Sequence, residues 1–474
     1  MLTNLAEPLL RHWITWHSLF VLSGLAIYVI ASHTLHQRRH PSTAIAWVLS
    51  LVLLPYIALP LYLIFGSRKL ANQRPEAGRN SLIPCASATD ALNVRTQQLA
   101  SVMALPPAAS YHQFHLHDEG AQALLALRTM IDSATRSIDL CTFIFAHDRL
   151  GEDIAQCLRR RAKDGVRVRL LVDGIGAYLG GRTDFKSLSA AGIQVAIFVP
   201  PLHSSLRGRT NLRNHRKMLI ADSDWLWCGG RNLAAEYFEG KTTSSSGSQP
   251  WLDLSFDVHG DLAVQAQQQF EQDWQFATAG SLPVPPPAVG SNIQPASASG
   301  QLIASGPDQK DDTFYTLLVS AFFACRKRIL VVTPYFVPDP TLLMSLTLAA
   351  RRGVSVDILM PKKSNHLLAD LARHRSLREL TGAGARVWFL PQMIHAKAVI
   401  IDDEIAFTGS ANLDARSLFL NYELMVAFYT ATDVKRIARW IEDRQSAALL
   451  YRAHPPGLWK EIAEGLLLWL AFQL

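Results

Sequence analysis

The chain has 474 residues, of which 49% are hydrophobic and 18% are charged. Because soluble domains typically carry roughly 25% charged residues, this composition argues against an ordinary soluble enzyme and favours a membrane-associated protein. The net charge of +7 indicates attraction to polyanions, for which anionic lipid surfaces and nucleic acids are equally suited. The five cysteines show neither paired nor metal-type spacing, which agrees with a reducing compartment.

Two N-terminal stretches, 13–31 and 44–65, contain no Asp, Glu, Lys or Arg. Each is long enough to cross a hydrocarbon core of roughly 30 Å at about 1.5 Å per residue, so the sequence predicts two transmembrane helices. A cleaved signal peptide is the alternative for the first stretch. The closeness of the second stretch and the lack of a small-x-small cleavage site disfavour it.

Basic residues flanking these stretches predict how they are oriented. More Lys and Arg lie on the outer flanks than in the connecting loop, so the positive-inside rule places the remainder of the chain in the cytoplasm. The outer flanks carry Arg11, Arg68, Lys69 and Arg74, and the loop carries Arg38 and Arg39.

The rest of the chain predicts an internal duplication. We expect an anchor at 1–70, a connector at 71–110, a first lobe at 111–276, a Pro- and Ser-rich linker at 277–300 and a second lobe at 301–474. Both lobes show the order helix, strand, helix, strand, strand. The expected ranges are 119–134, 137–145, 150–163, 166–172 and 194–198 in the first lobe, and 311–324, 328–333, 340–351, 354–360 and 386–389 in the second.

One polar motif occurs once in each lobe with identical spacing. Lys follows His by two residues, Asp follows His by seven, Gly follows Asp by seven and Asn follows Gly by three. Agreement at every spacing is very improbable by chance. The two copies are His215, Lys217, Asp222, Gly229 and Asn232, and His395, Lys397, Asp402, Gly409 and Asn412.

Each copy predicts a β-hairpin with a two-residue turn, 223–224 or 403–404. Side chains at i and i+2 share a face of a strand, so His395 and Lys397 project together. Asp402 lies on the opposite face, where it is expected to act as a structural anchor.

If Asp402 faces Ile405 across the turn, the register brings the polar residues of the two strands together. Gly230 and Ser410 are small and leave room for a ligand. The expected pairs are Asn412 with His395, Ser410 with Lys397, and Asn232 with His215.

This arrangement suits a phosphate ester. Two histidines on opposite sides supply an in-line nucleophile and an acid for the leaving group. The sequence has no carboxylate or Cys/His cluster typical of a metal site, so two Lys and two Asn would neutralise the phosphate charge without metal or cofactor. Because each half supplies one His, Lys and Asn, the site must form between the halves in a pseudo-twofold arrangement.

The double motif resembles that of the phospholipase D superfamily, and the residues around it resemble bacterial cardiolipin synthases. The resemblance implies an α/β fold of two phospholipase D-like lobes, mixed sheets flanked by helices, preceded by the two transmembrane helices, in the bacterial inner membrane. The stretches that carry it are Thr333-Pro334-Tyr335-Phe336-Val337-Pro338, Gly229-Gly230, Trp251-Leu252-Asp253-Leu254 and the N-terminal apolar pair.

The resemblance also implies a reaction: transfer of a phosphatidyl group from one phosphatidylglycerol to another, with release of glycerol, through a phosphohistidine. His215 would be the nucleophile and His395 the acid and base, although the near-symmetric motifs do not themselves distinguish them. Acids downstream of each motif, Asp253 after the first and Glu423 after the second, would orient the histidines. The residues expected to hold the phosphate are Lys217, Lys397, Asn232 and Asn412, supported by Ser410 and Gly230.

The expected partners are phosphatidylglycerol, other anionic phospholipids and the bilayer, and no nucleic acid. Alternatives are a phospholipase D that uses water and forms phosphatidic acid, a nuclease, and a non-catalytic membrane scaffold. The nuclease is disfavoured because no nucleic-acid module is recognisable, and the scaffold because both motifs are intact.

Three smaller features complete the analysis. The pair Gly174 and Gly176 predicts a tight turn. The apolar segment 459–474 is too short to span a membrane, and either core packing or an interfacial helix fits it. A basic group before the first motif fits either a solvated loop or a lipid-headgroup site. It comprises Arg207, Arg209, Arg213 and Arg216.

Overall fold

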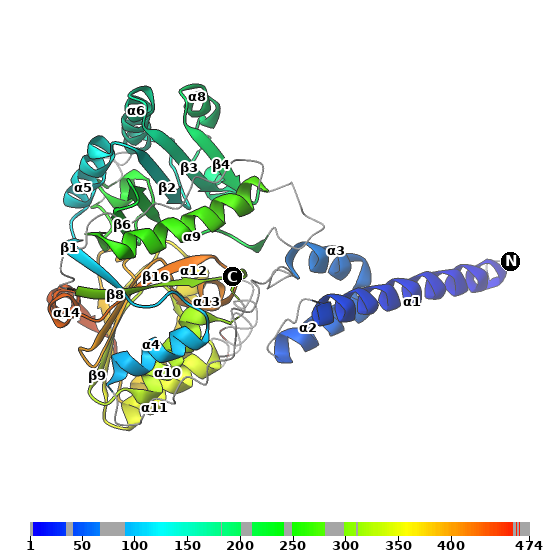
Figure 1. Cartoon of the computed structure of the whole chain (residues 1–474). Helices are drawn as coiled ribbons and strands as arrows, with labels where there is room; N and C mark the ends of the chain where they lie inside the picture. Colours follow the sequence, from blue (N-terminus) through cyan, green and yellow to red (C-terminus); the bar gives the residue numbers. More distant parts are fainter. Residues whose placement is uncertain are drawn as a thin grey trace.

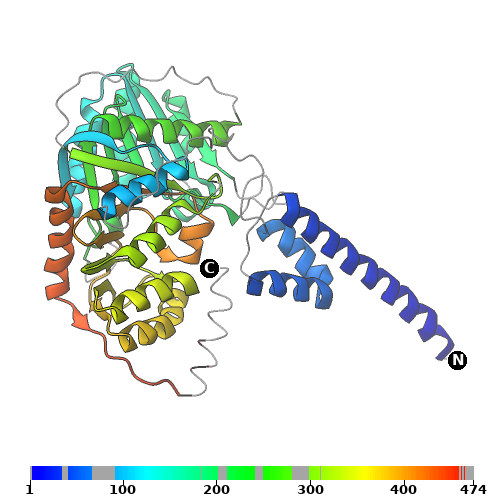
Figure 2. The ribbon, with the colours of Figure 1, turned by 60° about the horizontal axis from the view of Figure 1, so that its bottom comes forward.

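The protein is described by a computed structural model that covers residues 3–34, 41–66, 91–181, 183–200, 211–240, 249–279, 298–309, 311–457, 461 and 464. Figure 1 shows the N-terminal helices beside a larger body made of two halves, and Figure 2 turns the same ribbon. The middle of the linker and most of the C-terminal apolar segment lie outside the described ranges.

Three helices form the N-terminal part: α1 (Thr3–Thr34), α2 (Pro41–Leu53) and α3 (Pro55–Phe65). The apolar stretch 44–65 is divided because Pro55 begins a new helix, and the preceding Leu54 leaves helical geometry at φ −134° and ψ 53°. Among the helices described, none combines the length and the apolar character needed to cross a bilayer. The prediction of two transmembrane helices is therefore not supported.

The two predicted repeats of secondary structure are confirmed, with boundaries shifted by one to three residues at most ends. The first contains α5 (Gly120–Ser133), β2 (Ser137–Thr142), α6 (Arg149–Lys163), β3 (Arg167–Asp173) and β4 (Gln194–Phe198). The second contains α10 (Thr313–Ala324), β9 (Arg328–Val332), α11 (Pro340–Arg351), β11 (Ser355–Pro361) and β12 (Arg386–Leu390).

Matching caps explain why corresponding helices of the two repeats begin and end at equivalent positions. Asp148 caps α6 by accepting from the backbone N–H of Gly151, and Asp339 caps α11 by accepting from that of Leu342. After each helix comes a glycine, Gly165 or Gly353, with φ at +87°, a left-handed conformation that glycine adopts without strain.

Two antiparallel hairpins follow the repeats: β5 (Met218–Ala221) with β6 (Trp225–Gly229), and β13 (Ala398–Ile401) with β14 (Ile405–Gly409). The other strands are β1 (Ala109–His117), β7 (Ser255–His259), β8 (Ala298–Ser305), β10 (Phe336–Val337), β15 (Leu413–Asp414), β16 (Glu423–Phe428) and β17 (Leu449–Leu450). The other helices are α4 (Leu92–Val102), α7 (Gly174–Leu179), α8 (Phe185–Ala190), η3 (Ala235–Tyr237), α9 (Asp261–Thr278), α12 (Leu367–Gly382), α13 (Ala415–Phe419) and α14 (Ala431–Ser446).

The described strands, apart from the pair β10 and β15, form one mixed sheet. Its order is β17-β12-β11-β9-β13-β14-β16-β8-β1-β7-β6-β5-β2-β3-β4. The two central strands, β8 and β1, pair antiparallel, with Ser110 opposite Ser299, and relate the halves by a pseudo-twofold axis. The two lobes are thus confirmed as mixed α/β units, but their sheets are continuous.

Three segments differ from the expectations. The connector contains helix α4 and the start of β1, and the predicted linker ends inside β8. Gly174 and Gly176 begin helix α7, which Asp173 caps by accepting from Ile175 and Gly176 N–H, so the predicted tight turn is wrong.

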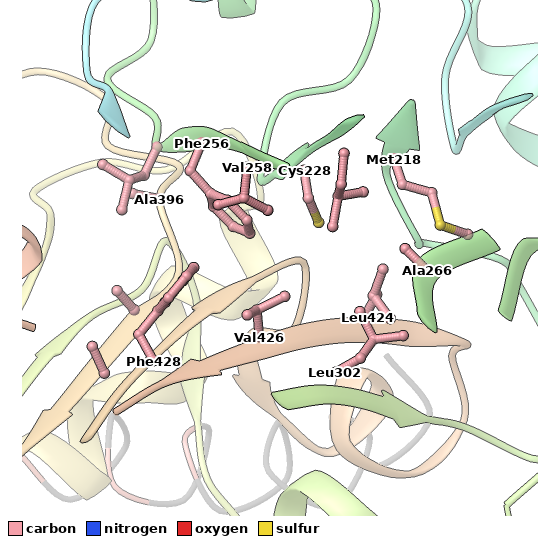
Figure 3. Close-up of a cluster of buried hydrophobic side chains, with 14 of the residues drawn as sticks. Met218, Cys228, Phe256, Val258, Ala266, Leu302, Ala396, Leu424, Val426 and Phe428 are labelled. Atoms are coloured by element: carbon pink, nitrogen blue, oxygen red, sulfur yellow. The ribbon is translucent and has the colours of Figure 1, made fainter. Parts of the chain in front are cut away.

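A shared hydrophobic core joins the halves. Figure 3 shows Cys228, Phe256 and Val258 of the first half above Val426 and Phe428 of the second. The Phe428 ring lies 5.1 Å from that of Phe256 and 5.0 Å from that of Phe114, so aromatic contacts cross the boundary. The halves are held in one arrangement.

Candidate active site

Both hairpins turn through three residues. Ile401 faces Ile405, and the first two turn residues, Asp402 and Asp403, have φ of 52° and 59°. Asp is among the residues that adopt this left-handed conformation most readily. The register therefore differs by one residue from the prediction, and the expected pairs of Asn412 with His395, Ser410 with Lys397 and Asn232 with His215 do not form.

The prediction that the motif aspartates are structural anchors is confirmed. Each carboxylate accepts several backbone N–H groups at the start of the neighbouring strand, which keeps its pKa below the ordinary value despite partial burial. The donors to Asp222 are Thr135 at 2.8 Å, Arg136 at 2.7 Å and Ser137 at 2.8 Å, and those to Asp402 are Arg326 at 2.7 Å, Lys327 at 2.7 Å and Arg328 at 3.0 Å.

The strand pairing places both His-x-Lys segments at equivalent points of the sheet. Met218 lies opposite Cys141 of β2, and Ala398 lies opposite Val332 of β9. The residues just before Met218 and Ala398 therefore lie at the carboxyl ends of the parallel strands, where α/β proteins commonly bind ligands.

Each histidine is tied by its backbone to the opposite half. His215 N–H donates to the carbonyl of Tyr422 at 2.8 Å, and His395 N–H donates to that of Leu252 at 2.6 Å. Tyr422 precedes Glu423, and Leu252 precedes Asp253. These backbone hydrogen bonds thus place the acid of each half close to the histidine of the other half.

The side chains confirm this crossing. Asp253 Oδ2 lies 2.7 Å from His395 Nδ1, and Glu423 Oε1 lies 3.6 Å from His215 Nδ1. The sequence predicted that these two acids orient the histidines but did not pair them, and in the structure each acid lies beside the histidine of the other half. The two acids are fully buried.

Burial and neighbouring charges set the protonation of the histidines. Burial lowers the pKa of both, and nearby lysines lower it further, well below the ordinary value for His215 and to about 4 for His395. The Lys397 ammonium lies 2.8 Å from His395 Nδ1 and 3.0 Å from its Nε2. Both imidazoles are therefore neutral at neutral pH.

The remaining charged groups are perturbed in different directions. Burial lowers the pKa of Lys217, and that of Lys397 to about 7. Burial raises the pKa of Glu423 to about 7, although Lys217 opposes the change. Burial would also raise the pKa of Asp253, but His395 outweighs it and holds the pKa below its ordinary value. Asp253 is therefore ionised and accepts the Nδ1 proton of His395, so Nε2 is the unprotonated nitrogen, which lies 3.0 Å from the Lys397 ammonium.

The small residues of the two motifs, Gly230 and Ser410, lie against the carboxylates of the two acids. A methyl group at Gly230 would overlap Asp253 Oδ1, so only glycine admits this carboxylate. At the equivalent position, the hydroxyl of Ser410 donates to Glu423 Oε2 at 2.5 Å. The room that the sequence analysis assigned to a ligand is used by the carboxylates.

The motif asparagines are buried in their own halves. The amide of Asn232 donates to the Tyr237 hydroxyl at 2.8 Å, and that of Asn412 donates to the Ser417 hydroxyl at 3.2 Å.

Two of the basic residues before the first motif have structural contacts. Arg216 is buried, donates to the carbonyl of Glu423 at 3.1 Å and forms an ion pair with Asp273, and Arg213 donates to the Val199 carbonyl at 2.9 Å. Neither belongs to a solvated loop or an open headgroup site. Arg207 and Arg209 lie outside the described residues.

Aromatic rings that the sequence analysis did not assign line the histidines. The ring centroid of Phe143 lies 4.0 Å from that of His215, and those of Tyr237 and Trp251 lie 5.0 and 5.8 Å from that of His395. Phe143 directly follows β2, whereas Tyr335 lies three residues after β9, so the two do not hold corresponding positions of the repeat and no shared sequence signal identified them. Within the described ranges, no group of three or more His, Cys, Asp or Glu is placed to hold a metal ion.

Comparison with known proteins gives matches over most of the chain. A family model described as "Cardiolipin synthase, PLD-like domain" matches residues 127–274 and 318–444, and one described as "Phospholipase_D-nuclease N-terminal" matches 21–67. Cardiolipin synthase A of Pseudomonas putida is 32% identical over 412 residues, covering 84% of this chain and 85% of that protein. Cardiolipin synthase 1 of Bacillus cereus is 32% identical over 439 residues, covering 86% and 84%.

Among solved structures, phosphatidylserine synthase of Haemophilus influenzae superposes with a TM-score of 0.58 over 80% of this chain and 97% of that one. The sequences are 13% identical, so this likeness concerns the fold alone.

Proposed function

This chain belongs to the phospholipase D-like cardiolipin synthase family, and we propose on that premise that it transfers a phosphatidyl group from one phosphatidylglycerol to a second, forming cardiolipin and glycerol. The observation that carries the proposal is the crossed pairing of two histidines with the acids of opposite halves. Such a site holds two titratable rings and two buried lysines around one position, as double displacement at phosphorus requires.

In the first step, His215 Nε2 attacks the phosphorus of phosphatidylglycerol, and the bond from phosphorus to the glycerol oxygen breaks. His395 gives its Nε2 proton to that oxygen, and glycerol leaves. His395 needs a proton for this step although its pKa is about 4 without substrate. An anionic phosphodiester between the histidines and lysines raises that pKa, and Asp253 stabilises the imidazolium.

In the second step, His395 accepts the proton of the hydroxyl on a second phosphatidylglycerol. The hydroxyl oxygen attacks phosphorus, the bond to His215 breaks, and cardiolipin is released. One proton moves out to glycerol and one moves in from the acceptor, so His395 returns to its initial state. Lys217, Lys397, Asn232 and Asn412 are proposed to stabilise the nonbridging oxygens.

The unequal acid partners support this assignment of roles. His395 has an ionised carboxylate at 2.7 Å, which suits a group that repeatedly carries a proton. His215 has a carboxyl group at 3.6 Å whose pKa is about 7, so the weaker partner leaves this imidazole unprotonated and nucleophilic. His215 is also the more exposed side chain, at 22% against 8%.

The N-terminal helices support action at a membrane. Their packing leaves many large apolar side chains exposed, a feature that marks interaction surfaces. We propose that they associate with the bacterial inner membrane, where the anionic phospholipid substrates reside. The exposed residues include Trp16, Leu19, Leu22, Val29, Ile30, Ile45, Leu49, Leu53, Leu54 and Ile57.

The test uses the purified full chain with phosphatidylglycerol carrying ³²P in its phosphodiester. The expected products are labelled cardiolipin and free glycerol, with acid-labile label on His215 after rapid quenching. Label in phosphatidic acid alone would assign hydrolysis by water instead. Inversion of configuration at phosphorus would exclude the covalent intermediate, since two displacements retain it.

A further inference from the structure

Two helices leave the sheet at the same side as the candidate site. α7 follows β3 and α12 follows β11, so both begin at the carboxyl ends of parallel strands, where the His-x-Lys segments also lie. They lie in corresponding connections of the two halves, α7 between β3 and β4 and α12 between β11 and β12. Each carries large apolar side chains that are exposed to solvent.

The first apolar patch is Tyr178 and Leu179, at the end of α7, which are 72% and 62% exposed. α7 packs tightly under the site, since a methyl group at Gly176 would overlap the carbonyl of Phe143, whose ring lies 4.0 Å from His215. Phe143 therefore contacts both the helix and a site histidine.

The second patch is Leu367, Leu368 and Leu371, at the start of α12. Leu367 is 72% exposed, Leu368 38% and Leu371 39%. Leu371 lies four residues after Leu367 and three after Leu368, so the three side chains share one helix face. Tyr335 ties this end of α12 to the site, because its hydroxyl donates to Asn365 at 2.5 Å and its ring centroid lies 6.4 Å from that of His395.

Basic side chains accompany both patches. Lys362 and Lys363 precede α12, and Lys186 lies in α8, the next helix after α7; all three are exposed. The acid nearest in sequence to the second patch, Asp370, is paired with Arg373 at 3.0 Å and accepts from Ser364 N–H. Apolar residues bordered by free cations match an anionic phospholipid surface, with its charged headgroups above its acyl chains.

We propose that Tyr178 and Leu179, together with Leu367, Leu368 and Leu371, form a paired docking surface that inserts into the headgroup region of an anionic bilayer. The inference rests on the proposed function, because it supplies the route by which lipid reaches the site. A bilayer is the occupant that fits, since a protein or a second copy covering both patches would also cover the site between them. A lipid surface instead delivers the substrate there.

Spin-label accessibility tests the placement. The four cysteines in the described part of the chain are buried, and Cys85→Ser removes the fifth, giving a background for single labels at Leu179→Cys and Leu367→Cys. Leu125→Cys is the matched control, because Leu125 is 67% exposed on α5. On vesicles of phosphatidylglycerol and phosphatidylethanolamine, labels at 179 and 367 should gain collisions with oxygen and lose collisions with a water-soluble nickel chelate, whereas the label at 125 should not change.

Labels at 179 and 367 that stay as water-accessible as the label at 125 in vesicle-bound protein would overturn the proposal. So would insertion of one label only, since the surface is paired. Labels that become immobile without gaining oxygen collisions would indicate a protein contact, and would overturn it as well.

Activity provides a second readout. Leu367→Ser/Leu371→Ser should lower cardiolipin formation on vesicles about tenfold and leave turnover of a short-chain phosphatidylglycerol below its critical micelle concentration unchanged. Leu125→Ser should change neither. Equal loss on both substrates would overturn docking in favour of a folding defect. If the labels at 179 and 367 insert into vesicles but the wild-type protein forms no cardiolipin, the proposed function fails and docking stands. If cardiolipin forms and the labels do not insert, only docking fails.

Discussion

Replacing Asp253 with Asn removes one charge from the site at nearly constant volume. The carboxylate lies 2.7 Å from His395 Nδ1 and is buried. At an effective dielectric constant of about 20, unit charges at that distance attract by about 6 kcal/mol, which corresponds to about 10⁴-fold in rate if the imidazolium forms in the transition state. The corresponding change in a serine protease triad costs a similar factor.

The same reasoning gives a smaller loss for Glu423→Gln. At 3.6 Å the attraction is about 5 kcal/mol. Because the pKa of Glu423 is raised to about 7, the group is ionised only about half of the time at neutral pH. Half of the molecules keep the full attraction, so we expect a loss of about 10³-fold, which is below that of Asp253→Asn.

A phosphatidyl ester of p-nitrophenol separates the two steps, because this leaving group departs without a proton. Asp253→Asn should retain a burst of p-nitrophenol and lose steady-state cardiolipin formation, since only acceptor deprotonation needs His395. Glu423→Gln should slow the burst itself. Asp257→Asn is the control, because Asp257 pairs with His115 at 3.0 Å outside the site, and both phases should persist. Loss of the burst in Asp253→Asn, with a normal burst in Glu423→Gln, would refute the crossed assignment.

Three further outcomes are expected. His215→Ala and His395→Ala should each lower steady-state turnover by at least about 10⁴-fold, and the double variant should be no worse; additive losses would contradict one shared site. Cardiolipin formation should persist in excess EDTA, and rescue of an EDTA-inhibited enzyme by one divalent ion would contradict charge neutralisation by Lys217 and Lys397. The pKa of Glu423 is higher in the folded than in the unfolded chain, so its contribution to the free energy of unfolding falls as pH rises from about 4.5 to about 7. In urea unfolding, the free energy of unfolding of Glu423→Gln should rise by about 3 kcal/mol relative to wild type across that range. A difference between the two proteins that does not depend on pH would contradict this prediction.

The repeated elements could be predicted closely because local patterns determine them. Helix α11 and strand β4 were placed without error, since an Asp-Pro start and a short apolar strand are local signals. The site histidines and lysines were found because two copies share every spacing. Neither signal depends on how the halves assemble.

What could not be predicted concerns contacts that spacing does not encode. The crossing of Asp253 and Glu423 depends on which strands of opposite halves meet, and the one-residue register shift depends on Asp402 adopting a left-handed backbone. The division of the second apolar stretch follows from Pro55, which begins a new helix. Composition alone did not reveal these features.

The antiparallel pairing of β1 with β8 bears on how such a chain could arise. An antiparallel contact across a twofold axis is self-complementary, so one half alone would present an open strand able to pair with its own copy. Such a homodimer would contain one site with two identical histidines facing each other. Joining the copies in one polypeptide frees each to change separately, and this chain carries the result: Gly230 with Asp253 in one half, and Ser410 with Glu423 in the other. Gene fusion thereby allows two equivalent histidines to become a nucleophile and an acid.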